Sequence, residues 1–301
     1  MKKALHSAFR GAGVVRDGKP ATYIPKLANA DPDLFGITAR SESGEFCSVG
    51  DAEVEFSIQS VSKAFTFALA LSELGVEEVY QRTGVEPSGD NFNSVVLDNR
   101  GLPFNPMVNA GAIAMTGLLC DVYREETFEY LHDAYNKFAS TELSVDRETY
   151  RSEIATADRN RAIAHLLHGS GVIGDVDLVV ETYTRQCALS VNTVSLSAMA
   201  LTLANSGVNA EGEQVVDAKA ARNTLSVMFS SGMYDYSGQW MVDVGVPAKS
   251  GVSGGLIACV NGQAGVASYS PPLDARGNSV RGVRAIRRMA NDLDWHVFHC
   301  D

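Results

Sequence analysis

The chain changes from a strand pattern to a helix pattern within the stretch Phe56-Ser57-Ile58-Gln59-Ser60-Val61-Ser62-Lys63. Residues 56–58 form a short alternating run that is typical of a strand. After this stretch, apolar residues recur at helical spacing, and Gly75 is expected to end the helix. Ser60 and Lys63 therefore stand at a predicted strand-to-helix junction.

Strand signals gather toward the two ends of the chain, and helix signals fill its middle. The Asn261-Gly262 pair between two apolar runs predicts a tight hairpin. We expect strands at 33–39, 45–50, 56–58, 256–260 and 263–269, and helices at 61–75, from 109 onward, 159–167, 177–187, 195–204, 220–229 and 279–293. This order predicts a single domain whose sheet lobe spans about 1–60 plus 215–301, with a helical lobe of about 61–214 inserted. A cleft between lobes is where we expect the site.

Composition and charge exclude several classes of protein. The chain has 301 residues, 45% of them hydrophobic, which is enough to bury a sizeable core. Its net charge of −11 disfavours nucleic-acid binding, because such a surface repels phosphate backbones. No segment reaches roughly 18 uninterrupted apolar residues, and His6 and Arg10 interrupt the signal-like N-terminus. We expect a cytoplasmic protein that binds neither nucleic acid nor membrane.

The cysteines and histidines form no pattern of a disulfide framework or a metal site. The five cysteines are scattered without a Cys-x-x-Cys pair, which favours reduced and mostly buried thiols. His165 and His168 share an expected helix, but no acidic or cysteine residue is spaced to complete a metal site. We therefore expect no metal and no organic cofactor.

Ser60 and Lys63 form the first candidate catalytic pair. Residues at i and i+3 share one face of a helix, so the hydroxyl and the amine can meet. The free N–H groups of a helix N-terminus also favour developing negative charge. A buried lysine can be driven toward its neutral form, which can then accept a serine proton. The spacing alone is common, and it equally fits an N-cap serine followed by a solvated lysine.

A second motif, Lys249-Ser250-Gly251, immediately precedes the predicted hairpin. Small residues let a strand edge approach a ligand, and their backbone N–H groups can form an oxyanion hole. Taken alone, the motif is better interpreted as a glycine-rich turn. Penicillin-recognising enzymes, however, combine Ser-x-x-Lys with a later Lys-Thr-Gly. The two motifs in this order therefore indicate an acylating serine enzyme.

Longer strings make the interpretation more specific, and they follow one another along the chain. They include Tyr23-Ile24-Pro25-x-Leu27-Ala28, Gln59-Ser60-x-Ser62-Lys63, Glu86-Pro87-Ser88-Gly89, Asn105-Pro106-Met107-Val108-Asn109, Asp158-Arg159-Asn160, Gly232-Met233-Tyr234-Asp235, Lys249-Ser250-Gly251-Val252 and Ser270-Pro271-Pro272-Leu273-Asp274. From about Ala21 to the last helix, the sequence resembles the serine-dependent glutaminase family in its bacterial form. The resemblance implies a β-lactamase/transpeptidase-like fold of mixed α and β structure, in which helices flank an antiparallel sheet.

The same resemblance implies that the chain hydrolyses L-glutamine and assigns roles to matching residues. Ser60 would be the nucleophile, with Lys63 and Tyr234 as a proton relay, and Lys249-Ser250-Gly251 would support them. The N–H groups of Ser60 and Val252 would form the oxyanion hole. The implied substrate-binding residues are Tyr23, Ser60, Asn109, Glu153, Asn160, Tyr183, Tyr234 and Val252. The resemblance also implies a homo-oligomer, either a dimer or a homotetramer.

These roles agree with the chemistry of glutamine, which is a zwitterion with an added carboxamide. Its ammonium group requires a carboxylate, which Glu153 can supply. Its carboxylate requires donors, which Asn160 and Tyr183 can supply. Singly, these three residues are more typical of a solvated helix charge, a capping residue and a core residue. Only their joint match to the family favours a binding site.

Two alternatives and one ambiguity remain at this point. The chain could be another acylating serine hydrolase, such as a penicillin-binding protein or a β-lactamase, although these are usually exported. It could also be a non-catalytic amino-acid-binding protein of the same fold, which the joint presence of Ser60, Lys63 and Lys249 disfavours. The general base stays undecided between Lys63 and Tyr234, because the two would titrate as a coupled pair.

Overall fold

The main sheet joins strands from the two ends of the chain. The computed structural model describes residues 1–22, 24–88 and 95–299. The five antiparallel strands lie in the order β2-β1-β8-β7-β6. They are β1 (Gly36–Ser41), β2 (Phe46–Gly50), β6 (Ala248–Ser250), β7 (Gly255–Val260) and β8 (Ala264–Tyr269). Pairing of β1 with β8 places Gly36 opposite Tyr269 and confirms that the chain ends share one sheet.

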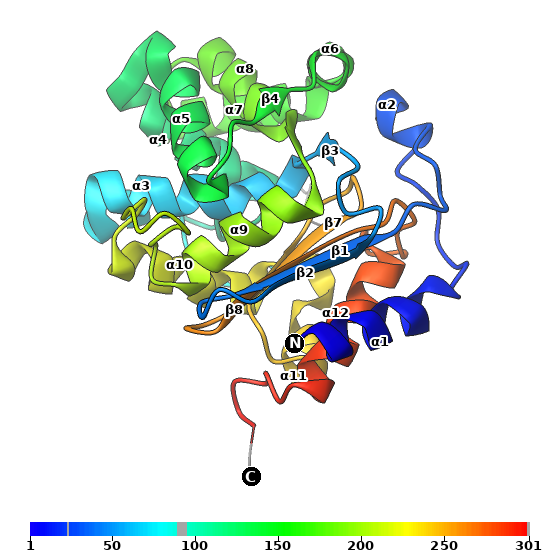
Figure 1. Ribbon diagram of the computed structural model, residues 1–301. Helices are drawn as coiled ribbons and strands as arrows, with labels where there is room; N and C mark the ends of the chain where they lie inside the picture. Colours follow the sequence, from blue (N-terminus) through cyan, green and yellow to red (C-terminus); the bar gives the residue numbers. More distant parts are fainter. Residues whose placement is uncertain (23, 89–94, 300–301) are drawn as a thin grey trace.

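Helices cover both faces of this sheet, as the sequence predicted (Figure 1). On one face, α9 (Thr193–Ala204) packs across β1, β7 and β8. On the other face, α1 (Lys2–Gly13) and α12 (Val280–Asp292) lie side by side. The division into lobes at residues 60 and 215 stays a prediction.

The middle of the chain forms a helical layer over α9. It contains α3 (Ser62–Tyr80), α4 (Asn109–Tyr123), α5 (Thr127–Ala139), α7 (Asp158–Gly169), α8 (Val176–Cys187) and α10 (Ala218–Ser231). Shorter helices are α2 (Pro25–Ala28), α6 (Arg147–Ala155) and α11 (Ser237–Asp243), and a small antiparallel sheet has the order β3 (Phe56–Ser57), β5 (Leu189–Val191), β4 (Ser144–Val145). Within the described residues, no helix is long and apolar enough to cross a membrane.

The helix that contains Lys63 ends at Gly75, as the sequence predicted. Gly75 has φ 79° and ψ 166°, which is not helical, and it separates two helical segments that together make up α3. The second segment, which runs to Tyr80 and was not predicted, is held by the core, where Val79 is fully buried. Sequence patterns also missed α1, α5 and α6. The cysteine prediction is confirmed for the described residues, where Cys47, Cys120, Cys187 and Cys259 are free and buried.

A glycine sets how closely the central helix approaches the sheet. A Cβ atom added at Gly265 in β8 would lie 2.2 Å from the backbone nitrogen of Leu201 in α9. That distance is far inside van der Waals contact, so any larger residue must push the helix away from the strand. The helix α9 directly follows β5, and β5 pairs with β3, the strand that leads into Ser60. The contact at Gly265 therefore holds an element that is connected to the site.

We expect Gly265→Ala to lower the free energy of unfolding by about 2 kcal/mol or more, because overpacked backbone contacts cannot relax cheaply. Urea unfolding followed by circular dichroism would measure the loss. Gly11→Ala is the matched control, because no atom lies within 4 Å of the added Cβ and the site is helical. The control should be neutral or stabilising by up to about 1 kcal/mol. Equal effects of the two substitutions would contradict the close-packing argument.

Candidate active site

Ser60 lies in a tight turn that connects the small sheet to the long helix α3. The turn is a single 3₁₀ segment, η1 (Gln59–Val61), and it is buried. Gln59 has φ 50°, a left-handed conformation that is uncommon outside glycine and that gathers at functional sites. Gly251 lies against this turn, since a Cβ there would be 3.2 Å from the Ile58 carbonyl oxygen. The Lys249-Ser250-Gly251 motif therefore packs directly beside Ser60.

Ser60 and Lys63 meet as their spacing predicted. The Lys63 Nζ donates a hydrogen bond to the Ser60 Oγ at 2.6 Å, and the Lys63 side chain is 1% exposed. Burial lowers the pKa of Lys63 from 10.5 to about 8, although the negative charge of nearby Glu153 acts in the opposite direction. A neutral amine is therefore accessible near physiological pH.

Two asparagines extend the contact from Lys63 into the helical layer. The Lys63 Nζ also donates to the Oδ1 of Asn109, at 2.8 Å. The Asn109 Nδ2 in turn donates to the Oδ1 of Asn160, at 3.1 Å. Asn109 begins α4 and Asn160 lies in the first turn of α7, so three helices contribute to one chain of polar contacts. These contacts fix the orientation of the Asn109 amide.

Glu153 on α6 reaches the same region and is held by Gln59. The Gln59 Nε2 donates to a Glu153 carboxylate oxygen and to the Ser57 Oγ, the latter at 3.1 Å. Burial raises the pKa of Glu153 from 4.5 to about 7, while the Gln59 hydrogen bond and the charge of Lys63 lower it. Sequence analysis did not single out Gln59, although it lies inside the Gln59-Ser60-x-Ser62-Lys63 string.

Tyr234 belongs to a segment far from Ser60 in the sequence, but its side chain lies close to Ser60. It begins the 3₁₀ segment η3 (Tyr234–Tyr236), with φ 57°. Its hydroxyl donates to the Ser250 carbonyl oxygen at 3.0 Å. Burial raises the pKa of Tyr234 above its ordinary value, and a hydrogen bond with Ser60 acts in the opposite direction. The tyrosine is therefore neutral and close to the serine.

Lys249 is a second buried lysine beside this group. Its Nζ donates to the Ser250 carbonyl oxygen at 2.7 Å and lies 4.5 Å from the centre of the Tyr234 ring. Burial holds the pKa of Lys249 well below its usual range, and the positive charge of Lys63 lowers it further. The Ser60-x-x-Lys63 motif and the Lys249-Ser250-Gly251 motif are thus adjacent in space.

A cavity of about 140 Å³ opens at Ser60. It is lined by Ile24, Gln59, Ser60, Asn109, Glu153, Thr156, Ala157, Arg159, Asn160, Tyr183, Cys187 and Val252. Six residues of the predicted site are on this wall. Tyr23, which was also predicted to line the pocket, lies outside the described residues. The sequence did not indicate Arg159 or Cys187, although Arg159 stands inside the Asp158-Arg159-Asn160 string.

Tyr183 and Cys187 form a neutral, buried part of the cavity wall. They lie four residues apart on α8, and both side chains are less than 5% exposed. Burial raises the pKa of Tyr183 well above its usual range and that of Cys187 to about 12. Both groups therefore stay protonated at neutral pH. Among the described residues, no three His, Cys, Asp or Glu side chains gather as metal ligands would.

Comparison with known proteins agrees with this geometry. Residues 18–298 match the sequence model of the Glutaminase family, which covers nearly the whole chain. The chain belongs to the glutaminase family. The family assignment that the sequence strings indicated is therefore confirmed.

Individual glutaminases are similar over almost the full length of this chain. Glutaminase 1 of Bradyrhizobium diazoefficiens is 51% identical over 94% of the chain, which spans only 46% of that relative. The chain thus spans about half of the length of this larger protein. Glutaminase of Trichormus variabilis is 44% identical, with 98% of the chain and 89% of the relative covered.

A solved structure described as the probable glutaminase ybaS has the same fold. It superposes with a TM-score of 0.96 at 37% sequence identity, covering 99% of this chain and 98% of the other. The predicted β-lactamase/transpeptidase-like class, with helices flanking an antiparallel sheet, is therefore confirmed.

The raised pKa of Glu153 predicts a pH-dependent effect of Glu153→Gln on stability. The folded state keeps this proton between pH 4.5 and about 7, where the unfolded chain has lost it. The stabilisation from the proton is thus complete below pH 4.5 and is lost as the pH rises through 7. We expect the variant to gain up to about 3 kcal/mol relative to wild type across this range. Urea unfolding at both ends of the range measures the difference, and a constant difference would refute the raised pKa.

Proposed function

We propose that this chain hydrolyses the side-chain amide of L-glutamine, giving L-glutamate and ammonia. The observation that carries the proposal is the 2.6 Å contact between the Ser60 Oγ and the buried Lys63 Nζ at the floor of the cavity. A serine is a weak nucleophile until a base removes its proton, and a buried lysine near neutrality is such a base. Membership of the glutaminase family supports glutamine as the amide.

The charges around the cavity support an amino-acid substrate. Glu153 presents a carboxylate that can pair with the substrate ammonium group. Asn160, Tyr183 and Arg159 line the same cavity and can donate hydrogen bonds to the substrate carboxylate. A simple amide lacks these charges and would leave Glu153 or the donors unpaired, at a cost of about 1–3 kcal/mol, which would select against it.

The first chemical step would form a glutamyl ester on Ser60. The serine oxygen attacks the carboxamide carbon while its proton passes to the relay of Lys63 and Tyr234. The oxygen of the tetrahedral intermediate becomes negative and would accept hydrogen bonds from the N–H groups of Ser60 and Val252. Each such donor contributes about 3 kcal/mol to the transition state. Collapse of the intermediate breaks the C–N bond, and the relay proton leaves with ammonia.

The second step would release L-glutamate. A water molecule gives its proton to the same relay and attacks the ester carbon, and Ser60 leaves as the hydroxyl after taking that proton back. Lys249 would assist indirectly, because its ammonium or amine group packs on the Tyr234 ring and shares the Ser250 carbonyl with it. The steps use groups of the chain and water, and none of them calls for a metal or an organic cofactor.

Assembly and location belong to the same proposal. The family resemblance supports a homo-oligomer, as a dimer or a homotetramer, and we propose a cytoplasmic location for the enzyme. Light scattering coupled to size-exclusion chromatography measures the first of these directly.

Ser60→Ala and Lys63→Met should each lower the rate of ammonia release from glutamine by more than about 1,000-fold, because nucleophile and base act as one unit. A coupled glutamate dehydrogenase assay measures this rate. Ser226→Ala is the control, because Ser226 is an exposed serine on α10 whose hydroxyl bonds its own helix.

Wild-type rates in either active-site variant would refute the assignment of the pair. Hydrolysis of a β-lactam without glutamine turnover would instead favour a penicillin-recognising enzyme. Glutamine binding by calorimetry without turnover would favour a non-catalytic binding protein.

The value of kcat/KM should rise with pH and level off above about pH 8. Lys63 must be neutral to act as a base, and its pKa is about 8. Glu153 must be ionised to hold the substrate, and its pKa is about 7. A plot of log kcat/KM against pH should therefore have a slope near 2 below pH 7, because two protons are lost, and near 1 just above it. A limb centred above pH 10 would contradict Lys63 as the base and indicate Tyr234.

A further inference from the structure

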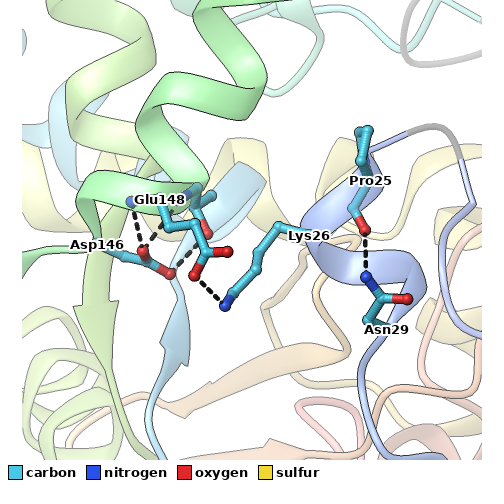
Figure 2. Close-up of polar contacts among 6 residues, drawn as sticks. Pro25, Lys26, Asn29, Asp146 and Glu148 are labelled. Carbon is cyan, nitrogen blue, oxygen red and sulfur yellow. Dashed lines mark hydrogen bonds and ion pairs between the residues drawn. The ribbon is translucent and has the colours of Figure 1, made fainter.

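An exposed ion pair connects two short helices that border the cavity. Lys26 on α2 and Glu148 on α6 are joined across a gap between the two elements, as Figure 2 shows. The Lys26 Nζ lies 2.5 Å from the Glu148 Oε2, and the two side chains are 41% and 74% exposed. The residues are 122 positions apart in the sequence, so no local pattern predicts the contact.

The helix α2 lies at the edge of the cavity and makes few apolar contacts with the rest of the molecule. It has only four residues, and Ile24, which precedes it, is buried and lines the cavity. Its apolar contacts belong to a small cluster that is separate from the two main cores of the described residues. This cluster consists of Ala21, Ile24, Leu27, Val252 and Leu273. Val252 is itself a wall residue of the cavity, so a shift of α2 would open the cavity beside it.

The helix α6 carries both Glu148 and Glu153. Its start is fixed by Asp146, whose carboxylate accepts hydrogen bonds from the N–H groups of Glu148 and Thr149, each at 3.0 Å. Of its residues, only Thr149 is fully buried, whereas Glu153 and Ile154 are half-buried, so much of α6 stays exposed. Helices with so little buried surface open at low free-energy cost. A contact between them therefore has a measurable effect on how long both stay in place.

We propose that Lys26 and Glu148 are positioning residues for substrate binding. By holding α2 against α6, the pair keeps Ile24 and Glu153 on facing sides of the cavity and slows escape of the bound amino acid. This inference rests on the proposed glutaminase function for its kinetic consequence. It requires no direct contact between the pair and the substrate, and it leaves Ser60 and Lys63 unaffected.

The effect should appear in KM, with kcat nearly unchanged. We expect Lys26→Met and Glu148→Gln each to raise KM for glutamine by about two- to fivefold, the range that exposed ion pairs support, with kcat within about twofold of wild type. The KM of the double variant should be no higher than the larger of the two single-variant KM values, because the interaction can be removed only once.

The direction in which KM changes in the two variants distinguishes a positioning role from a long-range electrostatic effect. The substitutions remove charges of opposite sign, so a long-range effect on the cavity would move KM in opposite directions. A shared increase therefore supports the positioning role, and opposite shifts or two unchanged KM values would overturn it. Raising NaCl from low to high concentration should increase KM of wild type more than KM of Lys26→Met, because salt screens exposed charges.

Lys137→Met is the matched control. Lys137 forms a comparable exposed ion pair with Glu213, at 2.8 Å and with side chains 54% and 44% exposed, but neither residue lines the cavity. Its KM should equal that of wild type. A rise as large as that of Lys26→Met would show a general effect of lost ion pairs and would overturn the proposal.

Hydrogen–deuterium exchange gives a readout that does not depend on turnover. Amides of residues 24–29 should exchange faster in Lys26→Met and Glu148→Gln than in wild type and Lys137→Met, and unchanged exchange would overturn the inference. If wild type released no ammonia from glutamine, the proposed function would fall, while this exchange experiment would still decide whether the pair holds α2.

Discussion

The site depends on keeping the Lys63 amine away from water while giving it partners. Removing an ammonium group from water costs several kcal/mol unless hydrogen bonds and nearby charges compensate. Here the Ser60 Oγ and the Asn109 Oδ1 accept hydrogen bonds from it, at 2.6 and 2.8 Å. The compensation is incomplete, because the pKa still falls to about 8. That shortfall leaves part of the amine neutral near physiological pH.

The architecture around Lys63 follows from this requirement. Asn109 is 46 positions from Lys63, and it in turn bonds Asn160, so α3, α4 and α7 must converge at one point. The Lys249-Ser250-Gly251 segment closes the other side, and glycine at position 251 allows close approach, because a Cβ there would lie 3.2 Å from the Ile58 carbonyl oxygen. Left-handed backbone at Gln59 and Tyr234 aims two further side chains at the same place.

Local patterns in the sequence predicted the features that depend on nearby residues. The Ser60–Lys63 contact, the hairpin at Asn261-Gly262 and most helices of the middle segment belong to this class. The strands at both chain ends predicted a shared sheet, and the family strings predicted six residues of the cavity wall. The contacts between Gln59 and Glu153 and between Lys26 and Glu148 could not be predicted, because polar residues distant in sequence carry no periodic signal. The end of the first helical segment at Gly75 belongs to the predictable class, whereas the second segment of α3 depends on burial in the core.

The pairing of β1 with β8 has a consequence for how the protein is made. The strand β1 and Ser60 are synthesised well before β8 and the Lys249-Ser250-Gly251 strand. During that interval the nascent chain carries Ser60 without the strands that complete the pocket. Such non-local pairing slows folding, and the unpaired edge of β1 stays exposed to aggregation until β8 is available. Assembly of the site therefore waits for strands that are made long after the serine.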